Sequence, residues 1–174
     1  DAGKDAVEYL KDTGIITKVH NLDVPATPLS VNVISNQYKV FPTDIGMLVG
    51  MLEDGTTDAI LSGRLGMGKG MLYEALIADA LYKRGGRFFY FAKESGLELD
   101  FVINYQGDST ILEVKARDGN AKSAKTVMAH PEHYGRTKLI QIKDSPLIIT
   151  DDVLTIPHYM AHLLFERRST LPAD

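Results

Sequence analysis

Residues 96–116 read GLELDFVINYQGDSTILEVKA, and this stretch decides the fold. Two runs rich in apolar residues, 97–105 and 110–115, flank a short turn at 106–109 that contains a glycine. Alternating apolar residues on either side of such a turn are typical of a β-hairpin. The sequence therefore predicts a hairpin at the centre of a sheet.

The two predicted strands carry charged residues inside runs that are otherwise apolar. Asp100 lies in the first run, and Glu113 and Lys115 lie in the second. Side chains alternate faces along a strand, so Glu113 and Lys115 share one face. A charge inside a buried strand is costly unless it is paired or bound to a metal ion. Each residue alone is more often a solvated hairpin residue, but the set can bind a divalent cation and activate water on a phosphodiester.

The clearest helix is predicted over residues 71–84, MLYEALIADALYKR, with Gly85 and Gly86 as its stop. Glu74 falls three and four residues before apolar positions of this helix, close to its buried side. A glutamate near a helix start also complements the helix dipole, which is the simpler explanation of Glu74 alone. Together with the hairpin, Glu74 is a candidate third acidic residue of one site.

A carboxylate on one hairpin strand, followed by apolar-Glu-x-Lys on the next, resembles the PD-(D/E)xK nuclease superfamily. Leu99 stands where the superfamily pattern has proline, a position that varies widely. More narrowly, the order of segments resembles the C-terminal domain of unknown function carried by a family of bacterial and archaeal AAA+ ATPases. The matching segments, in order, are YLKDTGIITKVHNLDVPATPLS, YKVFPTDIGML, KGMLYEALIADAL, ELDFVI, ILEVKA and TIPHYMAHLL.

The resemblance implies roles for particular residues. Asp100 and Glu113 would be the principal metal ligands, completed by Glu74 and the backbone carbonyl of Val114. These hard oxygen ligands suit Mg²⁺ or Mn²⁺ rather than zinc. Lys115 would orient or deprotonate the attacking water and stabilise the transition state.

Two functions are compatible with these features. The first is a nuclease-like C-terminal domain of an AAA+ ATPase that hydrolyses DNA with Mg²⁺, with DNA and the N-terminal ATPase module of the same chain as partners. The second is a catalytically silent module that binds DNA or a protein, or assists assembly of the ATPase. The net charge of −4 and the lack of basic–aromatic patches favour the second. Self-association into a homo-oligomer is compatible with both.

A glycine-rich segment, residues 61–70, precedes the predicted helix. Residues 63–69 fit the phosphate-loop pattern G-x-x-x-x-G-K, but Gly70 stands where that loop needs serine or threonine. A nucleotide site is therefore a weak third alternative, and a flexible turn is the simpler one. Arg64 and Lys69 could still contact a phosphate backbone from the start of the helix.

Further charged and histidine residues follow the hairpin. Lys122 and Lys125 lie three residues apart and could present charge together to a nucleic acid, although solvated lysines are the default. His158 and His162 are four residues apart, but they lack the glutamate of the H-E-x-x-H pattern. No zinc site is predicted.

The expected fold class is α/β, with a restriction-endonuclease-like core of central mixed sheet and flanking helices. Residues 1–40 are expected to form a helix and an extended arm, as in the end of a winged-helix unit, and residues 41–174 the nuclease-like domain. Residues 87–92 and 137–143 are predicted as strands, the latter parallel to its neighbour after a crossover helix. A last amphipathic helix is expected over 156–165, and a core helix within 41–54.

Composition sets the remaining bounds. A chain of 174 residues with 44% hydrophobic and 24% charged residues suits one globular domain. Without cysteine, disulfides and thiolate metal sites are impossible, and a cytoplasmic location is expected. There is no signal peptide and no apolar run near 18 residues. A first residue other than methionine suggests a piece of a longer protein.

Overall fold

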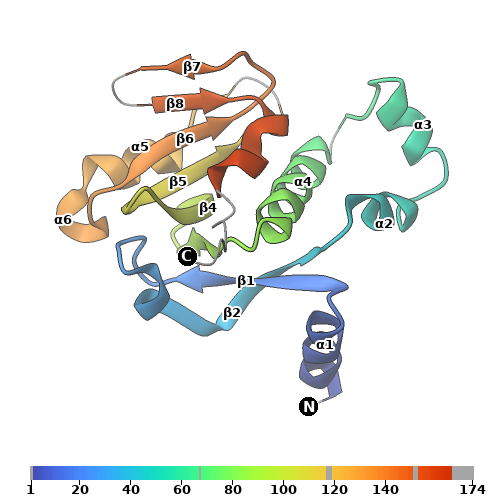
Figure 1. Ribbon diagram of the computed structural model, residues 1–174, viewed down its shortest axis with the longest axis horizontal. Helices are drawn as coiled ribbons and strands as arrows, with labels where there is room; N and C mark the ends of the chain where they lie inside the picture. The colour runs from blue at the N-terminus through green and yellow to red at the C-terminus, as the bar shows by residue number, and fades with distance from the viewer. Residues whose placement is uncertain (1, 67, 117–118, 151–152, 166–174) are drawn as a thin grey trace, which may run out of the picture.

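The computed structural model describes residues 2–66, 68–116, 119–150 and 153–165. Within that part of the chain, the fold is a mixed α/β architecture built on one eight-stranded sheet flanked by helices (Figure 1). The strands are β1 (Ile16–Leu22), β2 (Val33–Pro42), β3 (Phe88–Ala92), β4 (Glu98–Tyr105), β5 (Asp108–Val114), β6 (Lys138–Ile142), β7 (Ile148–Ile149) and β8 (Val153–Ile156). The helices are α1 (Ala2–Asp12), η1 (Leu29–Asn32), α2 (Ile45–Gly50), α3 (Thr56–Leu61), α4 (Lys69–Lys83), α5 (Lys122–Ala129), α6 (Pro131–Tyr134) and η2 (His158–Leu164).

The strand order is β2-β1-β3-β4-β5-β6-β8-β7. β3, β4 and β5 pair antiparallel, and β4 and β5 form the predicted hairpin. β6 pairs parallel with β5, as predicted, because α5 and α6 provide the crossover between them. The hairpin therefore lies at the centre of the sheet.

Helices cover both faces of this central part. On one face, Ile77 and Leu81 of α4 belong to the same buried cluster as Phe101 and Leu112. On the other face, Ala124 and Val127 of α5 belong to a second buried cluster. Its strand members include Val102 of β4 and Ile111 of β5. β5 is buried along nearly its whole length because it is covered twice. Burying each large apolar side chain here contributes roughly 1.5–3 kcal/mol.

The N-terminal strands join the same sheet through a side chain. β1 and β2 pair antiparallel, and β1 meets β3 at one registered pair, Asn21 with Tyr90. Asn21 is 2% exposed, and its carboxamide Nδ2 donates to the carbonyl of Ala92 at 3.0 Å while its Oδ1 accepts from the Ala92 N–H at 2.9 Å. The amide thus supplies the donor and acceptor that a backbone pair would supply. The winged-helix interpretation of residues 1–40 stays a prediction.

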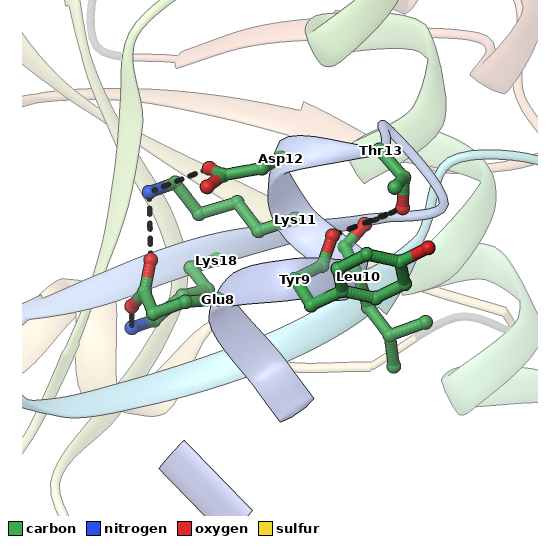
Figure 2. Close-up of polar contacts among 7 residues, drawn as sticks. All are labelled: Glu8, Tyr9, Leu10, Lys11, Asp12, Thr13 and Lys18. Carbon is green, nitrogen blue, oxygen red and sulfur yellow. Dashed lines mark hydrogen bonds and ion pairs between the residues drawn. The ribbon is translucent and has the colours of Figure 1, made fainter. Parts of the chain in front are cut away.

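Polar contacts hold α1 against β1 (Figure 2). Glu8 accepts hydrogen bonds from Lys18 at 2.5 Å and from Lys11 at 2.9 Å. These two ammonium groups, Lys18 first, lower the pKa of Glu8 to about 2. Thr13 ends the helix, since its hydroxyl donates to the carbonyls of Tyr9 and Leu10. The Glu8–Lys18 ion pair therefore joins α1 to β1, and Thr13 caps the end of the helix.

Four elements differ from expectation. The helix expected within 41–54 is short: α2 ends at Gly50 and has no fully buried residue, and it packs only at the edge of the core, through Ile45 and Leu48. α3 follows it unpredicted, and both extend beyond α4, away from the sheet (Figure 1). Near the C-terminus, Ile156 ends strand β8 rather than opening a helix, and η2 is a 3₁₀ helix. A residue before proline favours extended backbone, which Pro157 imposes on Ile156.

No helix among the described residues is long and apolar enough to cross a membrane.

Candidate active site

The four residues predicted to carry chemistry line one hollow at the end of the central hairpin. Its volume is about 340 Å³. The lining residues are Glu74, Gly96, Glu98, Asp100, Glu113, Lys115, Asn120, Lys122 and Ser123. They come from α4, from β4 and the turn before it, from the end of β5, and from the start of α5. The walls are therefore a helix and two central strands, with the next helix at the rim.

Asp100 and β5 are joined across the hairpin. The register pairs Phe101 with Leu112, which brings the preceding Asp100 beside the end of β5. One carboxylate oxygen of Asp100 accepts a hydrogen bond from the backbone N–H of Val114 at 2.7 Å. This bond fixes the Asp100 carboxylate next to Glu113. The other Asp100 oxygen, Oδ1, takes no part in the bond to Val114.

Glu113 is the most buried acid in the hollow, with 5% of the residue exposed. Its Oε1 accepts a hydrogen bond from the ammonium of Lys115 at 2.5 Å, two residues along the strand. Its Oε2 is buried and has no hydrogen-bond partner. A buried carboxylate oxygen without a partner is costly, and a bound cation would remove that cost. The donor set therefore fits a hard divalent ion.

Burial and mutual repulsion govern protonation in the hollow. Burial first, and then the negative charge of Glu113, raise the pKa of Asp100 to about 7, against the Val114 hydrogen bond and Lys115, which lower it. Burial also raises the pKa of Glu74. Burial disfavours the charged form of Lys115, but its hydrogen bond with Glu113 and the nearby carboxylates outweigh this, so the pKa of Lys115 is raised. Near neutral pH, Asp100 is therefore partly protonated, and a cation bound in the hollow would compete with that proton.

Two charged residues at this site were not predicted: Glu98 lines the hollow, and Lys39 lies beside it. Lys39 of β2 donates to Glu98 Oε1 at 2.5 Å and lies 4.0 Å from Glu74 Oε2. Glu98 stands two residues before Asp100 on β4, so strand alternation could have suggested that both share a face. For Lys39 no such local signal exists, because it comes from a strand 59 residues earlier in the chain.

His158 supports the backbone of the hollow. Its ring Nε2 lies 3.1 Å from the carbonyl oxygen of Lys115, to which a protonated Nε2 donates. The ring also stacks on Tyr73 of α4, with centroids 4.1 Å apart and an interplanar angle of 24°. Burial lowers the pKa of His158, which favours the neutral ring. His162 bonds instead to the carbonyl of Tyr159, so the two histidines serve different contacts.

The four lysine and arginine residues considered for nucleic-acid contact separate into two places. Lys122 lines the acidic hollow, and together with Asn120 and Lys125 it also lines an adjoining hollow of about 400 Å³ along α5. Lys69 lines a separate, largely apolar pocket of about 330 Å³ between α2, α3 and α4. Arg64 is exposed and donates to the Ser62 hydroxyl at 2.8 Å. Of these four residues, the structure places Lys122 in the hollow that holds the carboxylates and Lys125 in the adjoining one.

In this conformation, Glu113 and Glu74 lie next to lysines. Among the residues that the structure describes, no three acids or histidines are grouped closely enough to hold a metal ion together. Glu113 is held by Lys115, and Glu74 lies within 4.0 Å of Lys39. Full coordination by all three predicted acids would therefore require side-chain rotation.

The fold and the hollow define a mixed α/β domain with a carboxylate–lysine cluster at the end of its central hairpin. A family model described as "Domain of unknown function (DUF4143)" matches residues 69–159. The chain belongs to this family. The matched segment contains Glu74, Asp100, Glu113 and Lys115 and excludes Lys39. Searches of the curated proteins and of the solved structures give no match.

Proposed function

We propose that this domain is a metal-dependent phosphodiesterase of the PD-(D/E)xK type that cleaves DNA. The observation that carries the proposal is the buried Glu113, whose Oε2 has no hydrogen-bond partner and which lines the same hollow as Asp100 and Glu74. A buried acid of this kind, beside a lysine, is typical of sites that bind a cation and handle a proton.

The residues divide the work as follows. Asp100 and Glu113, with Glu74 and the carbonyl of Val114, would hold Mg²⁺ or Mn²⁺. When bound, the ion supplies Lewis-acid activation of water and neutralises phosphate charge. Lys115 releases its contact with Glu113, orients the attacking water and stabilises negative charge on the phosphate.

A path for the substrate is supported by the hollows along α5. The acidic hollow and its neighbour share Asn120 and Lys122, and the neighbour is also lined by Lys125. Both lysines are exposed, so their ammonium groups are available to phosphates. DNA would leave the site along α5 and away from Arg64 and Lys69.

The domain would act as the C-terminal part of an AAA+ ATPase. What supports this is the resemblance in the order of segments along the chain. The coding sequence directly upstream tests it: an ATP-binding module in the same reading frame is expected, and a start codon adjoining residue 1 would contradict it.

The test of the proposed function is a cleavage assay on linear, nicked and single-stranded DNA. Wild type is expected to cleave at least one substrate with Mg²⁺ or Mn²⁺ and not in EDTA. Lys115→Ala is expected to lose about 10²–10⁴-fold in rate, the usual contribution of a group that moves or orients a proton. Lys138→Ala, at the opposite end of the hairpin and paired with Asp108, is the matched control and should retain activity.

A second function, a catalytically silent DNA- or protein-binding module, is favoured by one observation. Glu113 and Glu98 already carry lysine partners, so the charge of the cluster is partly neutralised internally. If wild type cleaves none of the three DNAs in either metal, while DNA still binds, this second function replaces the first.

A further inference from the structure

The N-terminal hairpin places a lysine, Lys39, beside the acidic hollow and next to two of the acids that line it. Lys39 lies on β2, opposite Val19 of β1, and its side chain is 29% exposed. Its ammonium pairs with Glu98 at 2.5 Å, lies 4.0 Å from Glu74, and sits over the Tyr90 ring at 5.0 Å from the centroid. The lysine is thus held by acids from β4 and α4 and by an aromatic face from β3.

Lys39 and Lys115 share the acids between them. Lys115 pairs with Glu113, and Lys39 pairs with Glu98 and lies near Glu74, so two tethered ammonium groups partly neutralise the four acids that line the hollow. Among the described acids that line the hollow, Glu113 has a fully buried oxygen, Oε2, without a hydrogen-bond partner. A bound cation would give that oxygen a partner. To bind Glu74 as well, the cation would have to displace the ammonium of Lys39.

We infer that Lys39 is a positioning residue that competes with the divalent cation for Glu74 and so sets the metal concentration at which the site fills. The inference rests on the proposed metal site but not on DNA cleavage. Glu74 and Lys39 are at the limit of an ion pair, so Glu74 can turn from the lysine to the metal while Glu98 keeps Lys39 in place. Metal binding then couples the N-terminal hairpin to the centre of the sheet.

The size of the effect follows from Coulomb's law. A unit charge roughly 6 Å from a divalent ion, in a medium close to water, changes the affinity for that ion by about tenfold. Removing the charge of Lys39 is therefore expected to tighten metal binding about tenfold. Replacing it with another cation is expected to change little.

The experiment is a calorimetric titration of Mn²⁺ into the DNA-free protein. Lys39→Met is expected to bind Mn²⁺ about tenfold more tightly than wild type, and Lys39→Arg within about threefold of it. Lys18→Met is the matched control, because Lys18 lies on the neighbouring strand β1, pairs with Glu8 at 2.5 Å and sits 3.9 Å from the Tyr38 ring centroid. It should leave the Mn²⁺ affinity unchanged. Near-ultraviolet circular dichroism confirms that each variant is folded.

The outcomes separate the two proposals. Tighter binding in Lys39→Met alone supports the inference, also where wild type binds too weakly to measure. Equal or weaker binding in a folded Lys39→Met overturns it, and DNA cleavage by wild type in that case would leave the proposed function standing. Absence of Mn²⁺ binding in wild type and in Lys39→Met alike overturns both.

Discussion

Burial decides the chemistry of Asp100. Its pKa in the folded protein is about 7, against an ordinary value of 3.8 for an aspartate in water. The folded state therefore binds more protons than the unfolded chain between these values, and the contribution of Asp100 to stability falls as pH rises from about 4 to about 7. Above pH 7 the buried charge is a full cost, unless a cation is bound.

Asp100→Asn removes that cost and keeps an oxygen that can accept from the Val114 N–H. In EDTA at pH 8 the variant is expected to be more stable than wild type by roughly 1–2 kcal/mol, and the difference should shrink toward pH 4. Urea unfolding across this pH range measures it. Asp54→Asn, at an exposed position, should show no such trend. A constant difference across the range would mean that Asp100 does not titrate as described.

Residue patterns predicted the acidic cluster only in part. Asp100, Glu113 and Lys115 interrupt apolar runs, and that local anomaly is visible in the sequence. Glu98 carried the same signal through its two-residue spacing from Asp100. Lys39 carried none, because its place in the hollow depends on the pairing of strands far apart in the chain.

At the scale of elements, α5 lines the hollow that adjoins the acidic one, whereas Lys69 at the start of α4 lines a separate pocket. This separation gives a paired prediction. Replacing both Lys122 and Lys125 with glutamine should weaken DNA binding and reduce the slope of log affinity against log salt by roughly 1 for each lysine that contacts a phosphate. Replacing Arg64 and Lys69 with glutamine removes the same charge and should change neither.

Fluorescence anisotropy with labelled DNA and Ca²⁺, at several salt concentrations, measures both double variants. Equal losses in the two would place the DNA across α4 as well as α5. A loss only in the Arg64/Lys69 variant would reverse the assignment of the path.

Elements with strong local signals were predicted well. The β4–β5 hairpin followed from alternation and a glycine turn, α4 from its apolar repeat and double-glycine stop, and parallel β6 from the crossover. β8 was missed, and the helix predicted over 156–165 begins later, as the 3₁₀ helix η2, because Pro157 favours extended backbone at Ile156. The apolar face of α2 predicted a helix correctly, but only tertiary packing decides whether such a face is buried.

At the scale of the whole molecule, a buried amide reinforces the joint between the N-terminal hairpin and the rest of the sheet, beside the backbone pair of Asn21 with Tyr90. Asn21→Ala leaves the N–H and the carbonyl of Ala92 without the partners that Asn21 supplies. We expect a loss of roughly 2–3 kcal/mol in the free energy of unfolding, since unsatisfied buried backbone groups are costly. Thermal and urea unfolding measure it. Asn36→Ala, exposed on β2, should cost well below 1 kcal/mol, and similar values for both would show that the amide does not hold the joint.

The position of β1 beside β3 also limits how far this protein can be truncated from its N-terminal side. The family match begins at residue 69, after the whole N-terminal hairpin. A fragment starting there would present β3 as a bare sheet edge, whose free N–H and C=O groups recruit strands from other molecules. It would also lack the ammonium that faces Glu98 and Glu74. The smallest piece that can be transplanted into another protein therefore begins before Ile16.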